Sequence, residues 1–158
     1  MAKEIERKFL VDGDGWKDGA EKGVRLTQAY LMSGPQRSVR VRIFDGGRAR
    51  LTMKFGGAAL SRDEYEYDIP LADALELVCH ALGSVIDKTR YRLAEGAYVW
   101  EIDVYHGDLA GLVVAEVELP DEAATPHLPE WLGREVTGDA RYLNQTLSET
   151  GKRPQEAD

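Results

Sequence analysis

A chain of 158 residues, 43% of them hydrophobic, is long enough to form one domain with its own core. Its net charge of −8 argues against general nucleic-acid binding, which favours a basic protein, but leaves room for a local basic site. The single cysteine, Cys79, excludes an internal disulfide and suits a reducing compartment, so we expect a cytoplasmic protein.

Membrane and zinc sites are not expected either. No apolar run is long enough to span a bilayer, and a charged segment follows Met1 with no apolar leader between them. The histidines, His80, His106 and His127, have no partner at ligand spacing. We therefore predict neither a membrane partner nor a zinc centre.

Most of the chain alternates between apolar and polar residues, which is typical of strands that present one face to a core. Short turns rich in glycine separate these segments, and such turns favour antiparallel pairing. Eight strands are expected near residues 3–11, 24–33, 37–45, 48–56, 61–69, 85–94, 97–106 and 112–119.

Two segments have helical spacing. The first follows Pro70 and ends at Gly83, and the second covers roughly residues 139–149. A short helical turn is also expected near 121–125. The fold class is therefore α+β, an eight-stranded antiparallel barrel with helices packed on its outside. We expect one domain over residues 1–150 and a flexible tail over 151–158.

The polar face of these strands is almost purely ionic, and its charges are grouped by strand. On any one strand, such a face most often means exposure to solvent. Seven strands together favour a barrel whose ionic face lines the lumen and whose apolar face lies outside. The lumen would then hold eight carboxylates, Glu4, Glu6, Glu64, Glu66, Glu101, Asp103, Glu116 and Glu118, and seven cations, Lys8, Arg40, Arg42, Lys54, Lys88, Arg90 and Arg92.

Such a lumen favours a phosphorylated ligand with divalent cations. Arginine and lysine bind phosphate oxygens, and carboxylates without histidine or cysteine suit Mg²⁺ or Mn²⁺. A linear triphosphate carries about −4 at neutral pH, which two such ions would balance. A long acidic peptide could satisfy part of the same pattern.

The segment Glu4-Ile5-Glu6-Arg7-Lys8 resembles the ExExK signature of the CYTH proteins, or triphosphate tunnel metalloenzymes. Later landmarks follow in family order: "RVR" at 40–42, "TMK" ending at Lys54, "SRDEYE" at 61–66, "DKTRY" at 87–91, "EIDV" at 101–104, "AEVEL" at 115–119 and "DARYLN" at 139–144. The resemblance covers the chain to about residue 150 and is nearest to small bacterial members similar to inorganic triphosphatases.

The resemblance implies a tunnel that binds a triphosphate with one or two Mg²⁺ or Mn²⁺ ions. It implies catalytic roles for Glu6 and for Tyr30 paired with Lys54, although Tyr30 could equally be a buried tyrosine with one hydrogen bond. Metal-side carboxylates would be Glu4, Glu6, Asp103, Glu116 and Glu118. Phosphates would be held by Lys8, Arg40, Arg42, Lys54, Lys88 and Arg90, and by Arg141 unless it is a surface arginine. A second metal or a positioning role falls to Glu64, Glu66 and Glu101.

The predicted reaction is hydrolysis of inorganic tripolyphosphate to pyrophosphate and phosphate. Thiamine triphosphate, a nucleoside triphosphate and a class IV adenylate cyclase reaction are alternatives. The predicted lumen has few aromatic residues, chiefly Tyr30 and Tyr105, which disfavours an organic ring, but Trp16 or Trp131 on loops could supply a stacking surface. Other classes are a non-catalytic polyphosphate sensor and an acidic interaction module. The apolar outer face could also support a homodimer.

Overall fold

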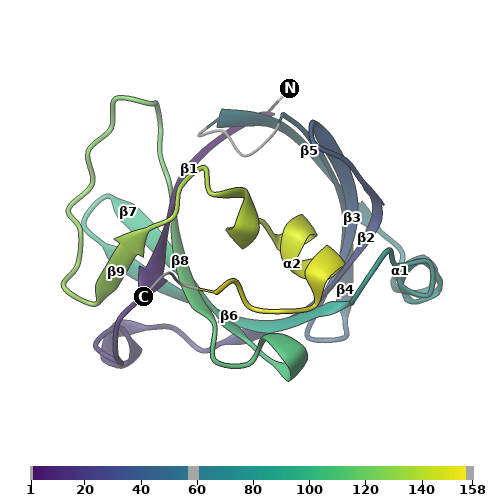
Figure 1. Ribbon diagram of the computed structural model, residues 1–158, viewed down its shortest axis with the longest axis horizontal. Helices are drawn as coiled ribbons and strands as arrows, with labels where there is room; N and C mark the ends of the chain where they lie inside the picture. Colours follow the sequence, from purple (N-terminus) through teal and green to yellow (C-terminus); the bar gives the residue numbers. More distant parts are fainter. Residues whose placement is uncertain (1, 57–60, 156–158) are drawn as a thin grey trace.

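The computed structural model describes residues 2–56 and 61–155, which form a closed antiparallel barrel (Figure 1). Its strands are β1 (Ala2–Val11), β2 (Val24–Ser33), β3 (Arg37–Phe44), β4 (Arg48–Phe55), β5 (Ser61–Ile69), β6 (Ile86–Glu95), β7 (Tyr98–Tyr105), β8 (Val113–Glu118) and β9 (Leu132–Glu135). The helices are α1 (Leu71–Val78) and α2 (Asn144–Thr150), with 3-10 turns η1 (Lys17–Gly19), η2 (Gly107–Leu109) and η3 (Ala140–Tyr142).

Two runs of neighbouring hairpins make up the barrel wall, β2-β3-β4-β5 and β6-β7-β8, with β2 beside β6. The N-terminal strand β1 closes the ring between β8 and β5. The eight predicted strands are confirmed. The short β9 adds to the edge of β1 and was not expected, because its four residues, LGRE, show no clear alternation.

The barrel has its apolar faces outside, as the alternation predicts. On one side, Val41, Ile43 and Ala49 pack beneath α1 through Ala74. On the other side, Trp100, Ile102, Val117 and their neighbours form a second apolar cluster. The segments before β2 and after β8 cover this second cluster, with Trp16 only 3% exposed.

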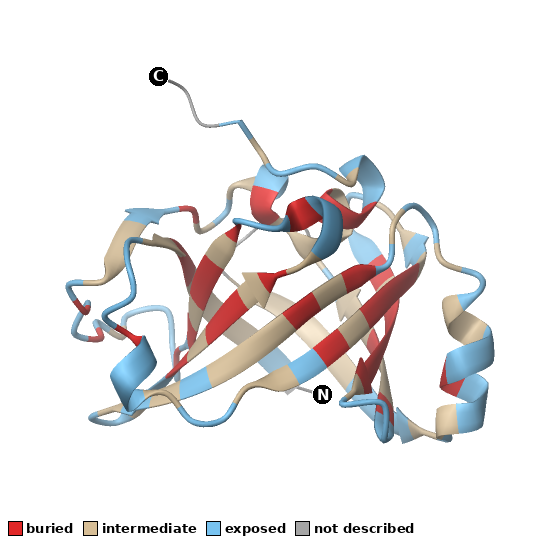
Figure 2. Cartoon of the chain, turned by 90° about the horizontal axis from the view of Figure 1, so that it is seen from below, coloured by how far each residue is buried: buried red, intermediate tan, exposed pale blue. Residues whose placement is uncertain are grey.

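The second helix does not lie on the outside of the barrel, so this part of the prediction is wrong. In Figure 1, α2 lies within the outline of the ring, and Figure 2, seen at right angles, places it across one end. Tyr142 and Leu147 pack there with Ile86, Tyr105 and Val114, which occupy inward positions at that end of their strands. The apolar face of this helix therefore fills the barrel end, because the lumen there is apolar rather than ionic.

At the helical turn expected near 121–125 the chain forms one hydrogen-bonded turn, in which the Ala124 N–H donates to the Asp121 carbonyl at 3.3 Å. The Asp121 carboxylate also accepts the Ala123 N–H at 2.8 Å, and the turn does not continue into a helix. The part of the chain that the structure describes contains no helix long and apolar enough to cross a membrane.

Candidate functional site

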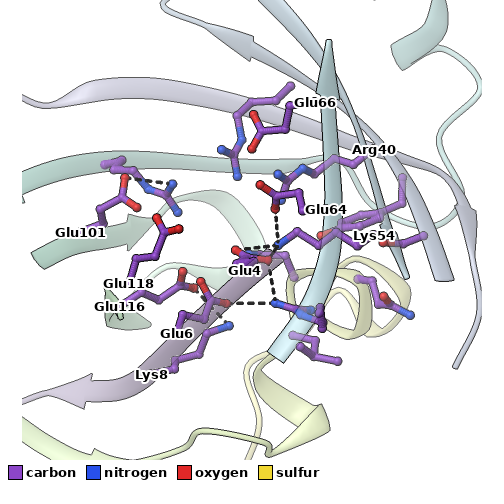
Figure 3. Close-up of a pocket in the computed structure, with 18 residues that line it drawn as sticks. Glu4, Glu6, Lys8, Arg40, Lys54, Glu64, Glu66, Glu101, Glu116 and Glu118 are labelled. Atoms are coloured by element: carbon purple, nitrogen blue, oxygen red, sulfur yellow. Dashed lines mark hydrogen bonds and ion pairs between the residues drawn. The ribbon is translucent and has the colours of Figure 1, made fainter. Parts of the chain in front are cut away.

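Side chains from all eight barrel strands converge on a cavity of about 120 Å³ inside the barrel (Figure 3). Alternate residues of each strand point inward, so the charged residues at these positions line the cavity. The charged lining comprises seven carboxylates and six cations: Glu4, Glu6, Glu64, Glu66, Glu101, Glu116 and Glu118 with Lys8, Arg40, Arg42, Lys54, Arg62 and Arg90. The end of the barrel that α2 fills, which we call the plug end, adds Leu143, Asn144 and Gln145.

Carboxylates crowd together where β1 lies beside β8. Glu6 pairs in register with Glu118, and Lys8 Nζ lies 3.2 Å from Glu116 Oε1. Burial raises the pKa of Glu6 well above its usual range, and the nearby charges of Glu116 and Glu4 raise it further. This side of the cavity therefore has a strong demand for positive charge.

Two cations of β4 and β5 meet that demand. Lys54 Nζ lies 2.9 Å from Glu4 and 3.3 Å from Glu64, while Arg62 Nη2 lies 3.0 Å from Glu6 and 3.6 Å from Glu4. Burial opposes ionisation of Glu4, but the charges of Lys54 and Arg62 prevail and lower its pKa to about 2. Glu4 is thus a carboxylate anion held between two protein cations.

The arginines of β3 lack such compensation. Arg40 is 6% exposed and its Nε is buried without an acceptor, and Arg42 Nε donates to the neutral amide of Gln28 at 2.5 Å. Within residues 2–56 and 61–155, neither guanidinium has a carboxylate within ion-pair distance. Burial lowers the pKa of Arg42 to about 9, and the charges of Arg40 and Arg90 contribute. Two buried cations side by side favour an anionic ligand.

Lys88 and Asp103 lie behind the cavity wall rather than in it. Lys88 is 0% exposed and Asp103 2%, and Lys88 Nζ lies 2.5 Å from Asp103 Oδ2. The other Asp103 oxygen accepts from Arg90 Nε at 2.7 Å. Burial would raise the pKa of Asp103, but Arg90 and Lys88 lower it to about 2. Asp103 therefore contacts both Arg90 and Lys88, and neither Lys88 nor Asp103 is among the residues that line the cavity.

Glu64 and Glu66 form a carboxylic acid–carboxylate pair on β5. Burial and the hydrogen bond to Glu66 raise the pKa of Glu64 to about 8. The same bond from Glu64 lowers the pKa of Glu66, with Arg50 adding to the effect. Glu64 therefore keeps a proton at neutral pH in the ligand-free protein.

Two other predicted residues behave differently from expectation. Tyr30 lines the cavity, but among the described residues Lys54 donates a hydrogen bond to Glu4 and lies beside Glu64, and no hydrogen bond joins it to Tyr30. The Arg141 side chain is 52% exposed and does not reach the cavity. It pairs with Asp139 at 2.7 Å, because Asp139 caps η3 and holds the arginine beside that turn.

Several lining residues were missed. Arg62 shares the phase of Glu64 and Glu66 on β5, so alternation alone could have identified it. Ser38 has the same relation to Arg40 and Arg42 on β3. Asn144 and Gln145 carry no such signal, because their place in the cavity depends on how α2 crosses the barrel end.

The donor chemistry of the acidic wall suits a hard divalent cation. Glu4, Glu6, Glu116 and Glu118 offer only oxygen ligands, and a cation would relieve the repulsion that raises the pKa of Glu6. Among the described residues, no group of three or more acidic, histidine or cysteine side chains is arranged as a metal site, and Lys8, Lys54 and Arg62 pair with carboxylates of this wall.

A closed antiparallel barrel with ionic side chains lining its lumen is the tunnel architecture that the sequence resemblance implies. The family model for the CYTH domain matches residues 2–150, so the chain belongs to the CYTH domain family. The first prediction, a resemblance to this family, is thereby confirmed.

Two relatives of this chain carry the name inorganic triphosphatase. The inorganic triphosphatase of Acetivibrio thermocellus is 48% identical over 150 residues, which cover 93% of this chain and 94% of that protein. The inorganic triphosphatase of Nitrosomonas europaea is 40% identical and covers 92% of this chain and 96% of that protein. The crystal structure of the inorganic triphosphatase NE1496 matches with a TM-score of 0.63 at 34% identity, covering 94% of this chain and 96% of that one.

Proposed function

We propose that this protein hydrolyses inorganic tripolyphosphate to pyrophosphate and phosphate with Mg²⁺ or Mn²⁺ as cofactor. The names of its relatives and its family membership support this proposal. The observation that carries it is the pair of buried guanidinium groups, Arg40 and Arg42, that face the cavity without carboxylate partners. A phosphate chain supplies the oxygens that such groups need.

The acidic wall would hold the cofactor. Glu4, Glu6, Glu116 and Glu118 are the candidate ligands, and Glu64, Glu66 and Glu101 remain candidates for a second ion or for positioning the bases. A bound divalent cation would neutralise phosphate charge as the terminal bond breaks. Either Mg²⁺ or Mn²⁺ fits this proposal, because both ions accept carboxylate oxygens as ligands.

The chain's own residues would do the rest. A water oxygen attacks the terminal phosphorus in line, the bridging P–O bond breaks, and pyrophosphate leaves with the bond's electron pair. Arg40, Arg42 and Arg90 would bind the oxygens on which negative charge gathers. Glu6 lines the cavity and is the predicted residue to take the proton that the water loses, and Tyr30 and Lys54 remain predicted partners in positioning that water.

The aromatic residues favour an inorganic substrate. Tyr30 is the aromatic residue of the described cavity lining. Tyr105 packs with Tyr142 and Leu147 in the apolar cluster at the plug end, which we call the plug cluster. Trp16 and Trp131 pack in the apolar cluster outside the barrel, so neither tryptophan offers a stacking surface to the lumen.

The lining of the barrel end opposite α2 also favours an inorganic substrate. A second cavity of about 420 Å³ there is lined by Lys22 and five arginines, with three glutamates. Three of these arginines surround Phe44, and their guanidinium carbons lie 4.7, 5.5 and 5.8 Å from the ring centre. This entrance therefore suits an anion better than an aromatic base.

The proposal is tested by offering tripolyphosphate with Mg²⁺ and measuring phosphate release. Wild type and Glu135→Gln, whose carboxylate pairs with Arg7 outside the cavity, should release phosphate at similar rates. Glu6→Gln should lose activity by about a hundredfold or more, as expected when a group that stabilises the transition state is removed. Equal rates for all three proteins would contradict the proposal.

A non-catalytic polyphosphate sensor shares the binding residues and would bind tripolyphosphate without turnover. The rate measurement separates it from the enzyme. The cytoplasmic location, the absence of nucleic-acid and membrane partners and the possible homodimer remain predictions from the sequence.

A further inference from the structure

Arg62 on β5 lies where the barrel closes, directly opposite Glu4 in the β1–β5 register. Among the described residues, it is the cation with ion pairs to both Glu4 and Glu6. Its side chain is 11% exposed, and the charges of these two carboxylates raise its pKa against the effect of burial. The guanidinium therefore sits on the two carboxylates of the N-terminal strand.

Free space adjoins this guanidinium. A small cavity of about 20 Å³, large enough for one water molecule, lies beside Arg62, Glu6 and Lys8 and is bounded by residues 136–139. The same three residues also line the main cavity. Arg62 therefore borders free space in both cavities.

A divalent cation held by the acidic wall and Arg62 would compete for the same two carboxylates. Glu6 Oε1 already accepts from Arg62, and the oxygen of Glu4 that lies 3.6 Å from Arg62 also lies 2.9 Å from Lys54. Positive charges a few ångströms apart in a buried site repel each other strongly. A divalent cation bound to these carboxylates would therefore repel the guanidinium.

We propose that Arg62 is a displaceable cation, which holds Glu4 and Glu6 in the free protein and turns to phosphate oxygens when a divalent cation and the substrate enter. This inference rests on the proposed function and assigns Arg62 to both states of the site. It makes Arg62 a competitor of the metal before substrate arrives and a phosphate-binding residue afterwards. It also predicts that the free protein binds metal weakly.

The first test measures Mn²⁺ binding without substrate, by electron paramagnetic resonance or calorimetry. Arg62→Gln removes the competing charge and should tighten Mn²⁺ binding by about tenfold, the effect of one nearby charge. Arg62→Lys should change it in the same direction by a smaller factor, because one ammonium group cannot bridge both carboxylates as a guanidinium does. Arg25→Gln, which breaks an exposed pair with Asp87, should leave Mn²⁺ binding unchanged.

The second test measures the KM for tripolyphosphate at saturating Mn²⁺, where Arg62→Gln should raise it by about tenfold through loss of a phosphate contact. A purely structural arginine would not tighten metal binding when removed. Unchanged or weaker Mn²⁺ binding by both Arg62 variants would overturn the inference while leaving the proposed function intact. Wild type that neither binds Mn²⁺ nor releases phosphate would instead contradict the proposed function.

Discussion

At the scale of single residues, burial shifts the pKa values of charged side chains in this protein as much as neighbouring charges do. Glu64 shows this, since its pKa of about 8 lies above its ordinary value of 4.5. A carboxyl group that binds its proton more tightly when folded stabilises the protein fully below pH 4.5, and this contribution is lost as the pH rises through about 8.

Glu64→Gln keeps the neutral form of this side chain at every pH. As the pH rises from about 5 to 8, we expect wild type to lose stability relative to Glu64→Gln, so that the variant is the more stable of the two above pH 8. Chemical denaturation of the ligand-free proteins from pH 5 to 9 measures this, and the slopes should differ by less than one bound proton. Identical slopes would show that Glu64 ionises normally.

The buried ion pair of Lys88 and Asp103 gives a second prediction at this scale. Asp103→Asn leaves Lys88 buried without its counter-charge, which should lower the free energy of unfolding by about 3–5 kcal/mol. Asp108→Asn, on the short η2 turn, serves as a control with little expected effect. Denaturant unfolding at pH 7 checks both, and a loss below about 1 kcal/mol for Asp103→Asn would contradict the pairing.

Sequence patterns identify the face of a strand but not the depth of a residue along it. Alternation correctly turned Glu6, Arg40 and Glu116 inward, and it would have done the same for Arg62. Lys88 and Asp103 share that inward phase, yet they are buried in contact with each other and do not line the cavity, whereas Arg90 does. That distinction depends on side-chain packing across strands, which a single strand does not encode.

At the scale of elements, α2 contributes both an apolar plug and polar cavity residues. Leu147 is 0% exposed in the plug cluster, while Asn144 and Gln145 line the cavity one turn earlier. Leu147→Ala should therefore cost about 2–5 kcal/mol of stability and also raise the KM for tripolyphosphate. The control is Leu75→Ala on α1, where the side chain is 56% exposed.

Thermal unfolding and steady-state kinetics of both leucine variants test this role. A Leu147→Ala protein with reduced stability but wild-type KM would show that α2 supports the fold without shaping the site. The strands and α1 were predictable because their periodicity is local. The position of α2 was not, since the same apolar stripe could cover the outside of a barrel or fill its end.

At the scale of the whole molecule, the barrel wall separates apolar packing on its outside from ionic side chains on its inside. Its outer apolar face is covered by α1 and by loops, and its interior collects the ionic residues. A cavity with seven carboxylates and six cations is costly to assemble without ligands. Tripolyphosphate with Mg²⁺ should therefore raise the Tm, since ligands that bind only the folded state stabilise it.

Removing the metal tests the proposed cofactor at the same scale. Excess EDTA should abolish both the rise in Tm and phosphate release, and added Mg²⁺ or Mn²⁺ should restore them. Phosphate release that persists at its full rate in EDTA would contradict a metal-assisted reaction.

The most direct test compares two arginines of one strand by kcat/KM for tripolyphosphate. Arg40 faces the cavity and Arg37 is exposed at the start of β3. Arg40→Gln should lower kcat/KM by about a hundredfold or more, while Arg37→Gln should stay within about twofold of wild type. Equal effects of the two substitutions would contradict the claim that the inward ionic face is the triphosphate site.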